Sequence, residues 1–87
     1  KTHRVLLVED NKTNRLIEKS LLQQAEIESI VACDGREAVE LFKQHKDSID
    51  LILMDLHMPV MNGYEAAQEI RKISADVPIV AMTQHGR

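Results

Sequence analysis

The stretch that decides the fold is Val5–Asp10, with the sequence VLLVED, in which four apolar residues are followed at once by two acids. A continuous apolar run of this length is typical of a parallel strand buried on both faces. Leu51–Asp55, with the sequence LILMD, repeats the pattern and ends in one acid. If the two runs are neighbouring parallel strands, Glu9, Asp10 and Asp55 meet at one edge of one sheet.

The rest of the chain alternates helix and strand patterns. These patterns predict strands at 5–8, 27–32, 50–54 and 79–82, and helices at 12–24, 36–46 and 64–73. This β-α-β-α-β-α-β order implies an α/β fold with a parallel sheet and helices on both faces. The strand at 27–32 is the more polar one, which indicates a sheet edge. In the first helix Ile17, Leu21 and Ala25 fall on one face at four-residue spacing, and Leu16 and Leu22 widen this apolar stripe.

Composition and charge exclude several classes of function. The chain has 87 residues, which is one small domain at most. A net charge of −3 and only two aromatic residues, Phe42 and Tyr64, argue against nucleic-acid binding. The single cysteine, Cys33, permits no internal disulfide and fits a reducing, cytoplasmic setting. No apolar run approaches the roughly 20 residues of a membrane span. The four histidines show no ligand spacing, which disfavours zinc, and no Gly-rich loop follows the first strand, which disfavours nucleotide binding.

The acids fall where parallel sheets bind ligands. In doubly wound sheets, ligands bind beyond the carboxyl ends of the strands, at the point where the winding direction reverses. For the strand order 2-1-3-4, a known order of such sheets, that point lies between the first and third strands. Crowded carboxylates repel one another, so the cluster needs a cation or a raised pKa. One acid after a strand is commonly a solvated loop residue or helix cap, but three at this point favour a Mg²⁺ site.

The positions of these residues suggest different roles for them. Asp55 is the candidate nucleophile, because a carboxylate beside a divalent ion can attack phosphorus once the ion offsets the repulsion. Glu9 and Asp10 are the candidate metal ligands, and the backbone carbonyl of His57 is within plausible reach. Thr83 follows the fourth strand, where its hydroxyl could donate to a phosphoryl oxygen on Asp55. A Thr that ends a strand is common, so Thr83 alone is weak evidence.

Taken together, these residues resemble the receiver domain of two-component response regulators. The resemblance runs the whole length of the chain. The matching stretches are VLLVEDN at 5–11, Asp34-Gly35 with Glu37-Ala38, LMD at 53–55, Met58-Pro59, MNG at 61–63 and PIVAMT at 78–83. Asn11, Asn14 and the Met-Pro-x-Met-Asn-Gly run are similar to receivers of hybrid sensor kinases and phosphorelays.

The resemblance implies a fold and a set of roles. The fold is a flavodoxin-like doubly wound parallel sheet of order 2-1-3-4 over residues 1–87. Asp55 is then the phosphoacceptor, Mg²⁺ is bound by Glu9, Asp10, Asp55 and the carbonyl of His57, and Thr83 is the switch hydroxyl. The implied partner is a histidine kinase or a histidine phosphotransfer protein that donates the phosphoryl group. The domain itself is not expected to be an enzyme, although its parent could be a hybrid histidine kinase.

The chain also departs from the family. It stops at Arg87, so we expect the domain to be incomplete at the C-terminus, without the family's fifth strand, its last two helices and its Lys. Ile79–Met82 would then present an unpaired edge, through which a dimer or strand exchange could form. Two other functions stay open. A dehalogenase-like phosphatase is disfavoured because His57 stands where its second Asp would be, and a protein-interaction module independent of phosphorylation is the main alternative.

Overall fold

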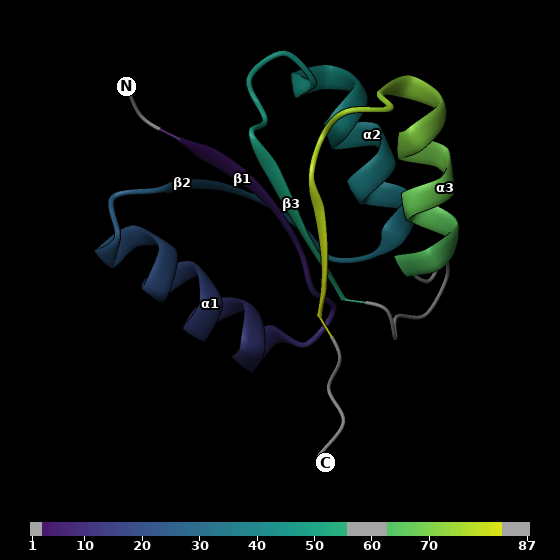
Figure 1. Cartoon of the computed structure of the whole chain (residues 1–87). Helices are drawn as coiled ribbons and strands as arrows, with labels where there is room; N and C mark the ends of the chain where they lie inside the picture. The colour runs from purple at the N-terminus through teal and green to yellow at the C-terminus, as the bar shows by residue number, and fades with distance from the viewer. Residues whose placement is uncertain (1–2, 56–62, 83–87) are drawn as a thin grey trace.

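The computed structural model describes residues 3–55 and 63–82. Strands and helices alternate along the chain (Figure 1): β1 (Arg4–Val8), α1 (Lys12–Gln24), β2 (Glu28–Ala32), α2 (Gly35–His45), β3 (Leu51–Asp55), α3 (Gly63–Ile73) and β4 (Ile79–Met82). Every element predicted from the sequence is present, and each boundary agrees to within one residue. The four strands are parallel in the order β2-β1-β3-β4, which confirms the predicted α/β sheet of order 2-1-3-4.

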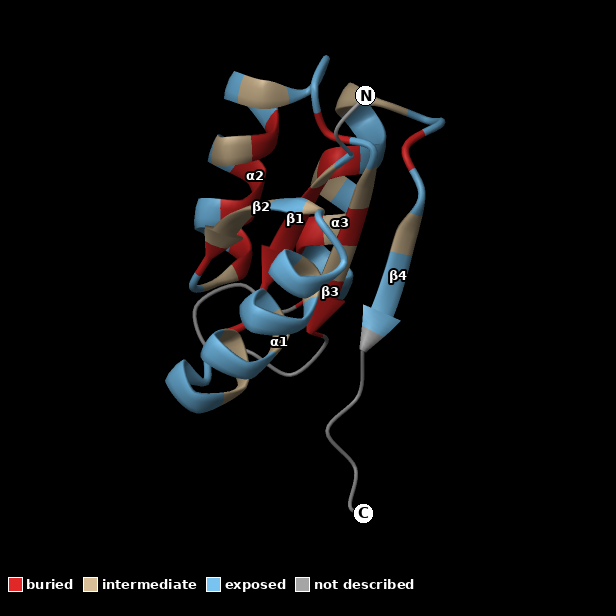
Figure 2. Ribbon diagram, turned by 90° about the vertical axis from the view of Figure 1, so that its left-hand side faces the viewer, coloured by how far each residue is buried: buried red, intermediate tan, exposed pale blue. Residues whose placement is uncertain are grey.

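The helices lie on both faces of the sheet. Figure 1 shows α1 on one side and the pair α2 and α3 on the other. The main core fills the space between the sheet and this helix pair, where burial of apolar surface supplies most of the stabilisation. It is formed by alternate strand residues and by the inner faces of the two helices: Leu6, Val8, Ile52, Met54, Ala38, Phe42, Ala66 and Ile70. Figure 2 shows this buried interior and the contrasting exposure of α1.

The two central strands end level with each other. Leu7 of β1 pairs with Val31 on one side and with Leu53 on the other, and Val8 pairs with Met54. All of Val5–Val8 is buried, as expected for a central strand covered on both faces. This register brings the residues that follow β1 next to the last residue of β3.

Side-chain caps fix where the first two helices begin. The Asn11 side chain accepts a hydrogen bond from the backbone N–H of Asn14 (2.9 Å), and Asp34 accepts one from Glu37 (2.8 Å). The Glu37 carboxylate in turn accepts from the backbone N–H of Cys33 (2.6 Å). These bonds satisfy N–H groups that a helix start or its approach leaves without an intrahelical partner. Asn11 and Asp34 are therefore the N-caps of α1 and α2.

The predicted apolar stripe of α1 does not cover the sheet. The structure describes every residue of α1 and none of them is buried; Leu16, Ile17 and Leu21 are 61%, 54% and 59% exposed. Ala25, just beyond the helix, is also exposed. The less exposed face of the helix consists instead of four mostly polar residues: Asn14, Arg15, Glu18 and Leu22.

Hydrogen bonds from Arg15 account for this orientation. Its guanidinium donates to the backbone carbonyls of Glu9 and Asp10, both at 3.1 Å. These bonds hold the polar face of α1 against the end of β1. The apolar spacing of the sequence therefore marks the outward face of α1, and the face toward the sheet is mostly polar.

Candidate metal centre

The three acids predicted from the sequence meet at the carboxyl end of the sheet. Glu9 and Asp55 each come one residue after the paired residues Val8 and Met54. The backbone N–H of Glu9 donates to the carbonyl of Ala32 (3.0 Å), which holds the chain in line with β1 beyond its last residue. One carboxylate oxygen from each of Glu9, Asp10 and Asp55 lies within 4.8 Å of the other two.

Burial differs sharply among these acids. Glu9 is 0% exposed and Asp55 is 1% exposed, whereas Asp10 is open to solvent. Burial raises the pKa of Glu9 to about 7; the hydrogen bond from the Asn11 N–H (3.2 Å) opposes this shift, while the carboxylates of Asp55 and Glu18 add to it. Near neutral pH Glu9 therefore exchanges a proton readily, and a bound cation would compete with that proton.

The donor set fits a hard divalent cation. It offers carboxylate oxygens from three side chains and no sulfur or imidazole, which suits Mg²⁺. Glu9 Oε1 is buried and has no hydrogen-bond partner among the described residues. A buried carboxylate oxygen without a donor is unfavourable, and a metal ion would supply the missing partner. Glu9, Asp10 and Asp55 are thus the described residues that would hold the ion.

A fourth acid near this cluster was missed by the sequence analysis. Burial raises the pKa of Glu18, and the charge of Asp55 adds to the shift. Its Oε1 is also buried without a hydrogen-bond partner in the described parts of the chain. The signal was present in the sequence: Glu18 lies one helical turn after Asn14 and two turns after the cap Asn11, on the face that leads back to the acids.

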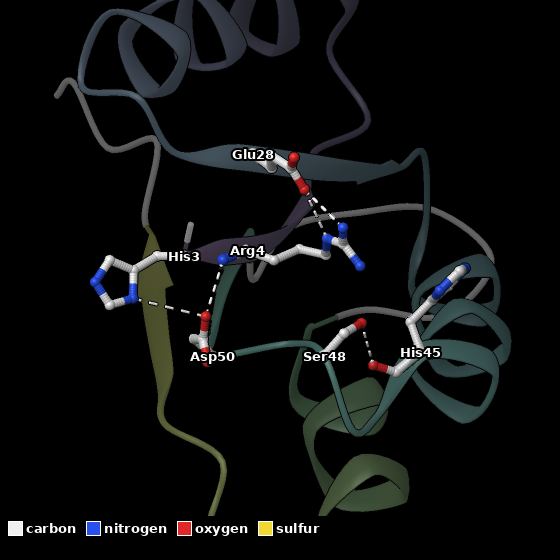
Figure 3. A network of polar contacts seen from close by, with 6 residues as sticks. All are labelled: His3, Arg4, Glu28, His45, Ser48 and Asp50. Atoms are coloured by element: carbon white, nitrogen blue, oxygen red, sulfur yellow. Dashed lines mark hydrogen bonds and ion pairs between the residues drawn. The ribbon is translucent and has the colours of Figure 1, made fainter. Parts of the chain in front are cut away.

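At the opposite end of the sheet the acids are paired with basic groups (Figure 3). The guanidinium of Arg4 contacts the Glu28 carboxylate at 2.6 Å, which joins β1 to β2. The backbone N–H of Arg4 donates to Asp50 (2.9 Å), and the His3 ring lies 3.7 Å from the same carboxylate oxygen. These contacts connect the starts of three strands. The acids at this end of the sheet therefore have a structural role.

Two predicted site residues lie outside the described residues. They are His57, whose carbonyl was predicted to bind the metal, and Thr83, the predicted switch hydroxyl. Pro59 of the matching motif lies outside them as well, while Gly63 is described and begins α3 in a buried position. Among the described helices, none is both long and apolar enough to cross a membrane.

Comparison with known proteins identifies the family to which this chain belongs. The model of the response regulator receiver domain matches residues 5–87. The autoinducer 1 sensor kinase/phosphatase LuxN of Vibrio campbellii is 44% identical over 79 residues, which cover 91% of this chain and 9% of that protein. The chain spans only 9% to 11% of the length of the first curated relatives, so it corresponds to one domain of them.

Solved receivers share the fold. The receiver domain of the sensor histidine kinase PA1611 of Pseudomonas aeruginosa, solved with a magnesium ion in its active-site cleft, superposes with a TM-score of 0.87 at 35% identity, over 93% of this chain and 66% of that one. The receiver domain of Ssk1 from Saccharomyces cerevisiae, solved with the histidine phosphotransfer protein Ypd1, gives 0.86 at 36% identity, over 99% and 66%. This chain belongs to the response regulator receiver domain family, whose members are signalling domains rather than enzymes, and its homologues include receivers of sensor kinases and hybrid histidine kinases.

Proposed function

We propose that this domain is the phosphoacceptor of a two-component or phosphorelay system. Asp55 receives a phosphoryl group from a phosphohistidine on a partner protein, and Mg²⁺ is the cofactor. The observation that supports this most strongly is the meeting of Glu9, Asp10 and Asp55, with carboxylate oxygens within 4.8 Å of one another at the ends of β1 and β3.

Each acid has a distinct part in the transfer. Mg²⁺, when bound, neutralises charge on the transferring group and so lets an anionic carboxylate approach it. An oxygen of Asp55 forms the new bond to phosphorus while the bond from phosphorus to the histidine nitrogen breaks. Asp55 is held rigidly for this role because it is the last residue of β3 and is almost wholly buried. Glu9, which is buried, and Asp10, which is exposed, would hold the cation beside Asp55.

The roles of His57 and Thr83 are extensions of the family resemblance. The His57 carbonyl serves as a further metal ligand, and the Thr83 hydroxyl hydrogen-bonds the phosphoryl group on Asp55. Thr83 directly follows β4, which pairs with β3 at the level of Asp55. A hydroxyl at that point could respond to phosphate and change the nearby surface, which would make a two-state switch.

The partner class is a histidine kinase or a histidine phosphotransfer protein. The Ssk1 receiver supports this assignment because it is similar in sequence and fold and was solved with such a protein. We assign residues 1–87 to the receiver domain, and the activity of any larger protein around it follows from its other domains.

Intact-mass spectrometry tests the phosphoacceptor role. The protein is incubated with a small phosphoramidate, which carries the same phosphorus–nitrogen bond as phosphohistidine, with and without Mg²⁺. We expect the mass of one phosphoryl group to be gained only with Mg²⁺ and to be lost in Asp55→Asn. Asp50→Asn is the matched control at the opposite end of the sheet and should still be labelled.

Two results would count against the proposal. One is labelling that persists in Asp55→Asn, and the other is the absence of labelling in the wild type with Mg²⁺. Binding of a histidine phosphotransfer protein that is unchanged by both Mg²⁺ and Asp55→Asn would favour the alternative, an interaction module independent of phosphorylation.

A further inference from the structure

Glu18 lies on the half-buried face of α1, in a position that its charge makes unfavourable. The helix places it one turn after Asn14, and the helix orientation is set by Arg15 at the end of β1. One of its two carboxylate oxygens, Oε1, is buried and has no hydrogen-bond partner in the part of the chain that the structure describes. Taking a carboxylate oxygen out of water without giving it a donor destabilises the folded state.

The groups that act on Glu18 are acidic. Asp55 raises the pKa of Glu18, and Glu18 in turn raises the pKa of Glu9. Glu18 therefore lies within electrostatic range of the metal centre. Arg15, one turn earlier on the same helix, directs its guanidinium to the carbonyls of Glu9 and Asp10. In the described residues no ion pair involves Glu18.

A divalent cation at the acid cluster would offset the repulsion between Glu18 and the other acids, and it would bring a hydrogen-bond donor for Glu18 Oε1. Mg²⁺ keeps several of its water molecules when it binds to carboxylates. Such water molecules are strong hydrogen-bond donors, and carboxylates outside the direct ligands commonly accept from them. A fourth negative charge near the site also increases the attraction for a dication.

We propose that Glu18 is an outer-sphere residue of the divalent-cation site, which accepts a hydrogen bond from a water molecule bound to Mg²⁺ and thereby strengthens Mg²⁺ binding. The inference rests on the metal site of the proposed function. It adds a positioning residue from α1 to a site otherwise built from the ends of β1 and β3.

The inference predicts two effects of opposite sign for one substitution. Without metal, the Glu18 carboxylate is unfavourable, so Glu18→Gln should leave the protein at least as stable as the wild type. With metal, the same carboxylate is a water acceptor, so Glu18→Gln should weaken Mg²⁺ binding by about tenfold. A residue that only supports the packing of α1 would instead lower the stability of the metal-free protein.

The experiment measures Mg²⁺ affinity by isothermal titration calorimetry and urea unfolding in EDTA on the same variants. Glu40→Gln is the matched control, because it removes the same charge from an exposed position on α2. Glu18→Asp keeps the charge but shortens the side chain, so its Mg²⁺ affinity should fall between those of the wild type and Glu18→Gln. Asp10→Asn, which alters a direct ligand, reports separately on the metal site.

The outcomes distinguish an outer-sphere role of Glu18 from a role in packing α1 and from the absence of a metal site. A Glu18→Gln protein with the Mg²⁺ affinity of Glu40→Gln would overturn the role of Glu18, while a loss of affinity in Asp10→Asn would leave the proposed function intact. Weaker binding accompanied by lower stability in EDTA would also overturn it, in favour of a packing role. A wild-type protein that binds no Mg²⁺ would overturn both this inference and the proposed metal site.

Discussion

The acidic side chains at the two ends of this sheet lie in opposite surroundings. At the amino end, Glu28 and Asp50 each lie against a basic group or a backbone donor, supplied by His3 and Arg4 (Figure 3). At the carboxyl end, Glu9 and Asp55 are more deeply buried than either of these acids, yet their carboxylates face each other and Asp10. The first arrangement stabilises the fold by itself, whereas in the second burial and the neighbouring carboxylates raise the pKa of Glu9, so that a proton or a cation at Glu9 stabilises the folded state.

This contrast indicates which end carries function. Folded proteins tolerate unfavourable charge arrangements mainly at functional sites, where stability is exchanged for activity. The parallel topology places both ends on the same four strands, so the difference comes from the side chains and not from the backbone. The same kind of substitution should therefore have different effects on Mg²⁺ binding and stability at the two ends of the sheet.

The largest expected difference concerns Mg²⁺ binding by two matched variants. Asp10→Asn removes a proposed ligand and should weaken Mg²⁺ binding by about 100-fold, because an amide oxygen carries no charge for the cation. Asp50→Asn makes the same chemical change at the amino end and should leave the affinity unchanged. Calorimetric titration measures both. Equal affinities in the two variants would refute the distinction between the ends.

The next effect is a dependence of stability on pH that comes from the carboxyl end. The pKa of Glu9 is about 7 in the folded protein and close to 4.5 in the unfolded chain. The folded state therefore holds this proton more tightly, so its stabilisation is fully present below the unfolded pKa and is lost as the pH rises through about 7. In EDTA we expect the free energy of unfolding to fall by about 2 kcal/mol between about pH 5 and about pH 8.

Urea unfolding at several pH values measures this dependence. Glu9→Gln should flatten it, because the variant has no titrating group at that position. Saturating Mg²⁺ should also reduce the fall, since the cation binds the deprotonated acids. A free energy of unfolding that rises over this range in EDTA, or a slope that Glu9→Gln leaves intact, would contradict the assignment to Glu9.

The smallest effect is expected at the amino end. Arg4→Met keeps most of the apolar stem but removes the guanidinium that contacts Glu28. Both side chains are at least one-third exposed, so the loss of stability should be only about 0.5 kcal/mol. Mg²⁺ affinity should not change. Urea unfolding and calorimetry on the same sample check both statements, and a Mg²⁺ affinity that falls in Arg4→Met would show that the two ends are coupled.

The central strands and the acid cluster were predictable from the sequence for a simple reason. A continuous apolar run must be buried on both faces, and in a parallel sheet the residues after two such neighbouring runs meet at one edge. Val5–Val8 and Leu51–Met54 therefore determined the place of Glu9, Asp10 and Asp55. The helix caps at Asn11 and Asp34 were also predictable, because side-chain acceptors at these positions bond to nearby backbone donors.

The face of α1 that turns inward was not predictable from hydrophobic spacing. The apolar residues Ile17 and Leu21 are periodic, but the hydrogen bonds of Arg15 to the end of β1 orient the helix the other way. Glu18 was not among the predicted site residues, although it lies one helical turn after Asn14 on the less exposed face of α1. Tertiary hydrogen bonds to backbone groups decided the orientation, and a periodicity argument contains no information about them.

The most direct test uses beryllofluoride, which mimics a phosphoryl group on an aspartate, and follows the backbone amide signals by NMR. With beryllofluoride and Mg²⁺ together, we expect saturable shifts at Glu9, Asp10 and Asp55, and unchanged signals at His3, Arg4 and Asp50. The absence of any shift at the carboxyl end, or shifts of equal size at both ends, would contradict the claim that the carboxyl end of the sheet is a Mg²⁺-dependent phosphoacceptor site.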